Sequence, residues 1–250
     1  MYAGKDYAEV LKTTGQFLLF LSVRPDRMRH GSLYLAVGIW SAWLAGIGRY
    51  WDHPNAPLWQ MIGLGSVAYI FVLALILYLL LWPLRPKNWS YLGVLTFVGM
   101  TSPPALLYAI PVERFTAMDT AQKINVWFLA VVAAWRVILL FLYLKRSAGL
   151  GGGTIVAAGL LPITLTVVAL TLLNLQHVVF RIMGGLREDE RGPHDAEYII
   201  LFMITILSFY SSPLLLMGYV GAVASRWNNR NEPEPVDVGA PLASDKSESP

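Results

Sequence analysis

One charged side chain, Arg136, stands in the middle of an apolar stretch, in the sequence AAWRVIL. An arginine at the centre of a membrane-spanning helix costs about 2.5–3.5 kcal/mol on insertion scales and therefore needs a partner. Three partners are open: backbone carbonyls around Gly99 and Met100, a side chain such as Asn174, or an anionic ligand. The first, which we favour, makes Arg136 a structural link between two helices. The third makes it a binding residue for a carboxylate, a phosphate or a lipid headgroup.

Two apolar stretches carry hydroxyl residues directly before proline: Thr101, Ser102, Pro103 and Pro104 in the first, and Ser211, Ser212 and Pro213 in the second. Proline has no N–H to donate to the carbonyl four residues earlier, and a carbonyl freed in hydrocarbon must find another donor. Each motif therefore predicts either a kink or a broken helix that lines a cavity. The four hydroxyl residues are candidate ligand-binding residues. Pro162 predicts a further kink in the stretch before the second motif.

Two more polar side chains, Asn174 and His177, lie toward the end of another apolar stretch. Residues three apart share a helical face. The pair is therefore either a set of ordinary polar residues of the bundle or part of a ligand-binding site. His177 or one of the hydroxyls would be the reactive group if the protein were a membrane enzyme acting on lipid.

The chain lacks the patterns of well-known catalytic and metal sites. It contains no His-Glu-x-x-His or Gly-x-Ser-x-Gly sequence and no nucleotide-binding loop, and its four histidines lie in distant segments. The cores of the apolar stretches contain no Asp or Glu, which disfavours proton-coupled transport through membrane carboxylates. We therefore predict no metal, no cofactor and no catalytic residue, and we lean against an enzyme.

The elements that would position these residues are membrane helices. Of the 250 residues, 56% are hydrophobic and 14% are charged, whereas soluble proteins carry about 25% charged residues. Several apolar runs exceed the roughly 18 residues that mark a spanning helix. The sequence predicts an all-α polytopic bundle of about six transmembrane helices, of which the third and sixth are kinked or interrupted, over residues 33–51, 58–82, 89–110, 126–144, 154–180 and 198–224.

The segments outside these stretches predict the topology. Residues 1–30 form a cytoplasmic amphipathic segment that lies in the membrane interface or packs on the bundle, residues 31–225 form the bundle, and residues 226–250 form a disordered cytoplasmic tail. With six spans, 12 Lys and Arg residues lie on the side of the termini and 6 on the other. Because positive charge concentrates in cytoplasmic loops, both termini are predicted to be cytoplasmic. The composition is typical of a bacterial inner-membrane protein.

The two hydroxyl–proline motifs occupy corresponding positions in two three-helix halves of opposite orientation. Interrupted helices at such positions are typical of transporter binding sites. We therefore predict a transport-like or ligand-binding role around Arg136. The alternative is a non-catalytic scaffold or subunit of a larger complex, in which the same features only hold the bundle together. The expected partners are the lipid bilayer, an anionic small molecule or lipid, and a protein partner or second copy, with no nucleic acid.

Overall fold

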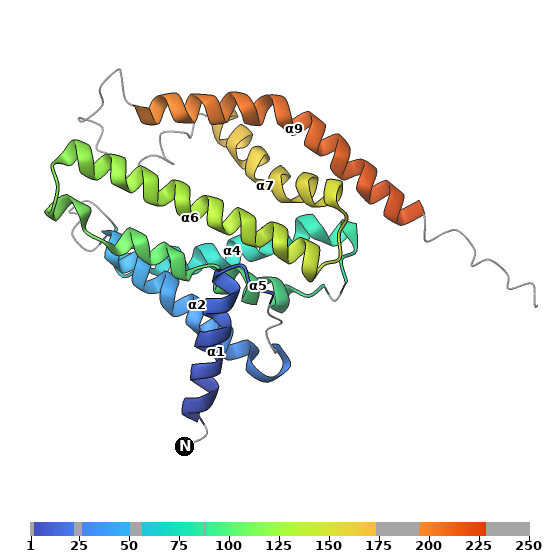
Figure 1. Cartoon of the computed structure of the whole chain (residues 1–250). Coiled ribbons are helices and arrows are strands. Elements are labelled where there is room, and N and C mark those ends of the chain that lie inside the picture. Colours follow the sequence, from blue (N-terminus) through green and yellow to red (C-terminus); the bar gives the residue numbers. More distant parts are fainter. Residues whose placement is uncertain (1–2, 23–26, 51–56, 88, 174–195, 229–250) are drawn as a thin grey trace, which may run out of the picture.

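The computed structural model describes residues 3–22, 27–50, 57–87, 89–173 and 196–228, and every regular element in these segments is a helix (Figure 1). Within these segments, five helices are long and apolar enough to cross a membrane, and a bent pair makes a sixth if it is counted as one span. In chain order the elements are α1 (Ala3–Leu18), α2 (Arg27–Tyr50), α3 (Leu58–Met61), α4 (Leu64–Leu81), η1 (Trp82–Leu84), α5 (Tyr91–Met100), η2 (Pro103–Ala109), η3 (Val112–Arg114), α6 (Met118–Arg146), α7 (Gly152–Leu172) and α9 (Ala196–Asn228).

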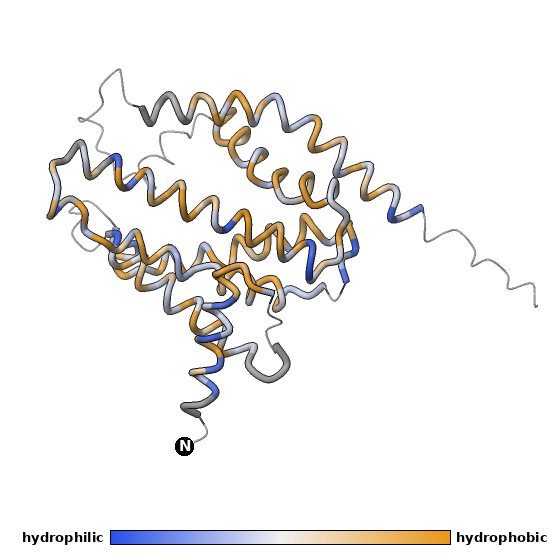
Figure 2. Tube along the Cα trace, viewed as in Figure 1, coloured by the Kyte–Doolittle hydropathy of each residue, from blue (hydrophilic) through white to orange (hydrophobic). Residues whose placement is uncertain are grey.

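The long helices form one bundle in which α2 lies against α4, α5 and η2, and α7 lies mainly against α9 (Figure 1). The middle of each long helix is predominantly apolar, and hydrophilic residues gather at helix ends and on α1 (Figure 2). This distribution suits helices that cross a hydrocarbon layer and end in water.

α2 and the α5–η2 pair run side by side in the same direction, with glycines at their contact. A Cβ atom at Gly38 would collide with the backbone of Gly99, and a Cβ atom at Gly48 would collide with Ala109. Ala42, one turn from Gly38, is also buried. Small residues at this spacing let helix backbones touch. α2 is therefore fixed against α5 and η2 along most of its length.

At one end of the bundle, three segments far apart in the sequence meet: the α4–α5 turn, the α6–α7 turn and the last turn of α9. The backbone N–H of Lys87 donates to the carbonyl of Ala148 at 3.2 Å. Arg226 Nη1 of α9 donates to the carbonyl of Leu84 at 2.9 Å. We call this the basic end, because it carries Arg85, Lys87, Lys145, Arg146 and Arg226. The opposite end carries η3, and we call it the η3 end.

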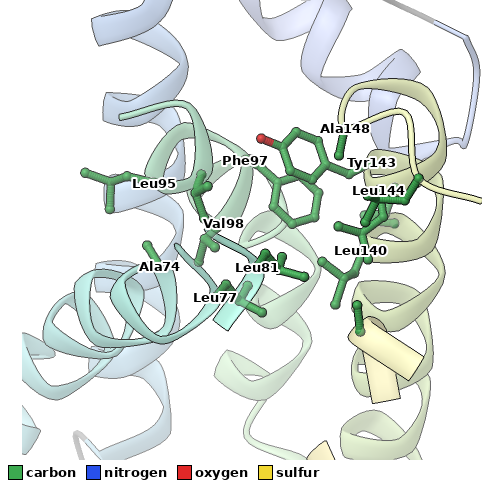
Figure 3. Close-up of a cluster of buried hydrophobic side chains, with 14 of the residues drawn as sticks. Ala74, Leu77, Leu81, Leu95, Phe97, Val98, Leu140, Tyr143, Leu144 and Ala148 are labelled. Atoms are coloured by element: carbon green, nitrogen blue, oxygen red, sulfur yellow. The ribbon is translucent and has the colours of Figure 1, made fainter. Parts of the chain in front are cut away.

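The main buried core lies in the half of the bundle next to the basic end (Figure 3). The rings of Phe97 and Tyr143 stack with their centroids 4.1 Å apart. Leu77 and Leu81 of α4 and Leu144 of α6 belong to the same cluster of buried side chains. This cluster joins α4, α5, α6 and α7 into one tightly packed body.

Toward the η3 end, α4, α6 and α7 expose more of their surface. Among the described side chains, Ile70 is the one that α4 buries between residues 64 and 73, and Val132 is the one that α6 buries between residues 123 and 138. In α7, none is buried after Thr164. These three helices are therefore closely packed in the half next to the basic end and loosely packed in the other half.

The N-terminal helix α1 packs on the bundle and crosses the direction of the long helices (Figure 1). Val10 is fully buried and clusters with Met100 at the end of α5. The indole Nε1 of Trp135 in α6 donates to the carbonyl of Leu18 at 2.8 Å. α1 is therefore joined to α5 and α6 by these contacts.

Several helix bounds differ from those expected. α2 begins at Arg27 and α6 at Met118, both earlier than expected. For α6 the reason is that the polar residues before its apolar core contain no proline or glycine that would stop the helix. The second expected span is divided into α3 and α4 at Gly63, whose φ of +75° favours glycine. Pro162 and Pro213 lie inside α7 and α9, which continue through them. The end of the fifth expected span, beyond residue 173, lies outside the described residues.

Candidate functional site

Arg136 lies near the middle of α6, on the side of the helix that faces the bundle. Residues four before, three after and seven after it share its helical face. These residues are Val132, Leu139 and Tyr143, and all three are buried. Arg136 itself is half-buried. Its side chain is therefore directed toward neighbouring helices rather than away from the bundle.

The guanidinium of Arg136 is bonded to the break between α5 and η2. Its Nε donates to the backbone carbonyl of Thr101 at 3.2 Å. α5 ends at Met100, and the helix axis turns by 44° into η2. Across the turn, backbone hydrogen bonds join residues three apart instead of four apart. The N–H of Ala105 therefore donates to the carbonyl of Ser102 rather than to that of Thr101. The Thr101 carbonyl is therefore available to Arg136.

This acceptor differs slightly from the expected one. The sequence indicated the carbonyls around Gly99 and Met100, which lie four residues before the two prolines. In the structure, the Gly99 carbonyl accepts from the N–H of Ser102 at 2.9 Å, because the chain tightens at the end of α5. The tighter turn satisfies Gly99 and leaves Thr101 for the arginine. A link between the third and fourth expected spans, as in the first alternative, is thus present.

The hydroxyls of Thr101 and Ser102 are directed back to their own helix. Thr101 Oγ1 donates to the carbonyl of Val98 at 2.7 Å, and Ser102 Oγ donates to the same carbonyl at 3.3 Å. Both residues are buried. The structure therefore brings Thr101 to Arg136 through its backbone, whereas the two hydroxyls stabilise the end of α5.

Two arginine–tyrosine contacts in this part of the bundle involve three residues that were not expected at the site. The Cζ atom of Arg136 lies 5.9 Å from the ring centroid of Tyr69 in α4, within cation–π range. The Cζ atom of Arg49, in the last turn of α2, lies 5.6 Å from the ring centroid of Tyr108 in η2. Arg136, Arg49 and Tyr69 all interact electrostatically with the Tyr108 hydroxyl. We call these four residues, one each from α2, α4, η2 and α6, the Arg–Tyr cluster.

Little in the sequence marks the three additional residues. Arg49 stands at the end of an apolar stretch, where charges are common. Tyr69 lies in an apolar stretch in which nothing distinguishes it. Tyr108 follows the prolines of the third expected span, which was the one available signal. Tyr108 lies in η2, after the bend that follows α5, and there it contacts Arg49 of α2.

The guanidinium of Arg136 has donors that the Thr101 bond does not use. Arginine has five N–H donors, and four of them are on its two terminal nitrogens. Within the described segments, these terminal nitrogens have no hydrogen-bond partner and Arg136 forms no ion pair. Polar groups in the hydrocarbon region must be paired or hydrated. The site can therefore accept an anion or water at this arginine.

The other expected site residues lie elsewhere or cannot be placed. Ser212 Oγ donates to the carbonyl of Phe209 at 3.2 Å, within its own helix. Ser211, also on α9, is half-buried. α9 packs mainly against α7, so its described contacts do not bring these serines to the Arg–Tyr cluster. Asn174 and His177 lie outside the described residues.

The described segments contain no group of three or more His, Cys, Asp or Glu residues that could hold a metal ion. Comparison of the chain with protein-family models, with curated proteins and with solved structures gives no match. Its function must therefore be inferred from its residues and their geometry.

Proposed function

We propose that the protein binds an anionic group inside the membrane at Arg136, in a transport-like or ligand-binding role. The observation that carries this proposal is the guanidinium of Arg136, whose terminal nitrogens have no hydrogen-bond partner among the described residues. It lies in the middle of a helix long enough to span a membrane. A cation in the hydrocarbon region is costly unless it is paired. An anionic ligand supplies that pairing. The bond to Thr101 holds the arginine in place before the ligand arrives, which lowers the entropic cost of binding.

The packing of the helices supports a transport-like role. A continuous buried core fills the half next to the basic end, whereas α4, α6 and α7 bury few of their described side chains toward the η3 end. Arg136 lies where these two halves meet. A binding site near the membrane midplane, closed toward one side and open toward the other, is what an alternating-access transporter requires of each of its states.

We also propose that the basic end is cytoplasmic, that both termini lie on that side, and that the protein belongs to the bacterial inner membrane. Five basic residues from three segments gather at that end, which agrees with the positive-inside rule. The chain has no cysteine, so single-cysteine variants report sidedness without background. Ser147→Cys, at the basic end, should react with an impermeant maleimide only from the cytoplasm, and Thr120→Cys, at the η3 end, only from outside. Reversed labelling would overturn this orientation.

The test of anion binding is the thermal stability of the purified full chain across a panel of anions and anionic lipids. Arg136→Gln removes the charge at the site. Arg146→Gln is the matched control, because Arg146 lies on the same helix and also donates to backbone carbonyls, those of Phe20 and Leu21 at 3.2 Å. We expect a ligand to raise the Tm of the wild type and of Arg146→Gln, and to leave folded Arg136→Gln unchanged. The proposal is wrong if no ligand stabilises the wild type, or if stabilisation survives in Arg136→Gln.

A non-catalytic scaffold or membrane subunit is the second candidate function. The Arg136–Thr101 bond favours it, because this bond links α6 to the break between α5 and η2. In a scaffold, Arg136→Gln lowers the Tm and neither protein responds to any anion. The same measurement therefore separates the two candidates.

A further inference from the structure

At the basic end, three contacts join the last turn of α9 to the turn between α4 and α5. The indole Nε1 of Trp227 donates to the carbonyl of Pro83 at 3.1 Å. Arg226 Nη1 donates to the carbonyl of Leu84 at 2.9 Å. The Cζ atom of Arg85 lies over the Trp227 ring, 4.0 Å from its centroid. The indole beneath Arg85 is therefore fixed on both sides by hydrogen bonds to the same turn.

The backbone of Arg85 has a conformation that is unusual for an arginine. Its φ of +47° and ψ of +60° lie in the left-handed region, directly after η1. Glycine is the usual residue there, because a Cβ atom makes this conformation costly. A costly backbone conformation points to a role for the side chain that the turn presents. Here the turn places the Arg85 side chain on Trp227.

The guanidinium of Arg85 keeps its hydrogen-bond donors available. Its cation–π contact with Trp227 uses the face of the ring and no hydrogen bond. Arg85 is exposed, and within the described segments it forms no hydrogen bond or ion pair. Two parallel N–H groups of a guanidinium bind two oxygens of a carboxylate or phosphate. Because the contact with Trp227 already restricts the side chain, binding costs less conformational entropy.

The depth of Arg85 in the membrane is indicated by tryptophans at the same end. Trp82, in η1, is 63% exposed and Trp227 is 51% exposed. Indole rings prefer the boundary between hydrocarbon and water, where lipid headgroups lie. The acidic residues whose side chains the structure describes, Asp6 and Glu9, belong to α1. An exposed arginine at this boundary therefore meets headgroup phosphates, and the described side chains of the turn and of α9 offer it no carboxylate.

We infer that Arg85, held against Trp227, is a binding site for the phosphate of an anionic phospholipid in the leaflet at the basic end. The guanidinium binds two phosphate oxygens, and Arg226 is a positioning residue that holds α9 to the turn. The lipid is anionic because five basic residues gather at this end. Phosphatidylcholine also has a phosphate, but its choline cation opposes that charge. The site goes beyond the proposed function, since it lies far along the chain from Arg136 and at the end of the bundle.

The test titrates the purified full chain, in an uncharged detergent, with short-chain phosphatidylglycerol and follows the Tm. Phosphatidylcholine with the same acyl chains is titrated in parallel and should raise the Tm less. Lys145→Gln is the matched control, because it removes the same charge from an exposed position at the same end. Arg85→Gln should raise the half-saturating concentration of phosphatidylglycerol about tenfold relative to this control, the loss expected for a hydrogen bond to a charged group. Should Arg85→Gln fail to fold, Arg85→Lys replaces it, because it keeps the charge and removes the parallel N–H groups.

Two variants of Trp227 test whether its ring positions the arginine. Trp227→Leu keeps every charge but removes the ring, so it should weaken phosphatidylglycerol binding, with no further loss when it is combined with Arg85→Gln. Trp227→Phe keeps an aromatic face without the hydrogen bond to Pro83, and should bind the lipid nearly as the wild type does. If the Arg85 and Trp227 variants lower the Tm without lipid but leave the half-saturating concentration unchanged, the contact is only structural and the inference is wrong.

Three other outcomes also overturn the inference. Inorganic phosphate, added at matched ionic strength with phosphatidylcholine alone, may not reproduce the stabilisation with the same dependence on Arg85, because the ligand would then be a soluble ion. Equal binding of phosphatidylglycerol by Arg85→Gln and Lys145→Gln would show attraction by the general positive charge of this end. The sequence after α9 contains Glu232 and Glu234. A response that is absent from the wild type and appears only in Glu232→Gln with Glu234→Gln would assign Arg85 to the chain's own carboxylates.

A last comparison keeps this site separate from Arg136. Arg136→Gln should respond to phosphatidylglycerol as the wild type does, because Arg136 is bonded to the break between α5 and η2 and not to the basic end. Loss of the response in Arg136→Gln would contradict the inference. The anion and lipid panel for Arg136 is accordingly repeated in the Arg85→Gln background, where a response reports on Arg136 alone. Failure at one site then leaves the conclusion at the other intact.

Discussion

The two halves of the bundle are held together differently. Next to the basic end, the rings of Phe97 and Tyr143 stack, and buried leucines of α4 and α6 fill the space around them. Toward the η3 end, α2 still touches η2 at Gly48 and Ala109, but α4, α6 and α7 bury few side chains. The stacked rings and the buried leucines therefore distinguish the half next to the basic end.

This difference determines what an arginine can do in each half. Arg146, at the basic end of α6, uses one terminal nitrogen to bind two backbone carbonyls, those of Phe20 and Leu21. Arg136, on the same helix where close packing ends, uses only Nε among the described contacts. Arg146 therefore joins the residues that follow α1 to α6. Arg136 keeps donors available, and we attribute this to the looser packing of α4, α6 and α7 beside it.

The largest effect is expected where the backbones of α2 and α5 touch. In Gly38→Ala the new Cβ atom meets the backbone of Gly99, which cannot move aside without shifting α5. Overpacking costs about 1–3 kcal/mol and more where backbone is involved, so we expect a loss of about 3 kcal/mol in unfolding free energy in detergent. Gly31→Ala, on the same helix with nothing within 4 Å, should be neutral or gain up to about 1 kcal/mol. Equal stabilities for the two variants would show that the contact between Gly38 and Gly99 does not stabilise the bundle.

A smaller but distinct effect is expected in the reactivity of α4 toward water-soluble reagents. Tyr69 is 50% exposed beside Arg136, and Leu79 is 56% exposed in the half next to the basic end. If the η3-end half is hydrated around Arg136, Tyr69→Cys should react with an impermeant thiosulfonate about tenfold faster than Leu79→Cys. Equally slow labelling would mean that both positions face lipid, and the transport-like role would lose its support.

The spanning helices were predictable because hydrocarbon imposes a simple rule on sequence. A helix in lipid must be apolar for about 20 residues, and each of the described long helices satisfies this rule. The small-residue contact through Gly38 was also predictable, because Gly38, Ala42 and Gly46 repeat every four residues and small residues at that spacing let helix backbones approach. The pairing of α7 with α9 was not, because apolar surfaces in lipid have no strong preference for one neighbour over another.

Of the site, only the residue that stands out by its own type could be predicted from the sequence. Arg136 stands out because a charge in an apolar helix is costly. Its acceptor, the Thr101 carbonyl, depends on a change from four-residue to three-residue bonding at the bend, which the prolines suggest but do not determine. Arg49, Tyr69 and Tyr108 come together through tertiary structure, and the prolines before Tyr108 were their one signal in the sequence.

An effect of similar size is expected on anion binding if the bend between α5 and η2 is removed. In the double variant Pro103→Ala with Pro104→Ala, an uninterrupted helix would let the N–H of Ala105 take the Thr101 carbonyl from Arg136. Anion binding should weaken about tenfold, equivalent to roughly 1.4 kcal/mol, which is near the net value of a hydrogen bond to a charged group. Pro162→Ala in α7 is the control and should keep the wild-type affinity. An unchanged affinity in the double variant would mean that Thr101 does not position the arginine.

The smallest effect is expected on α9, and it bears on whether the two hydroxyl–proline motifs form one site. Ser212 bonds within its own helix and Ser211 is half-buried, so the double variant Ser211→Ala with Ser212→Ala should change stability by no more than about 0.5 kcal/mol. It should also leave unchanged the rise in Tm that an anion gives the wild type, measured in parallel with Arg136→Gln. A loss of affinity would show that α9 reaches the Arg–Tyr cluster when ligand is bound. The loosely packed half would then be one state of a site that closes, with both motifs facing the same anion.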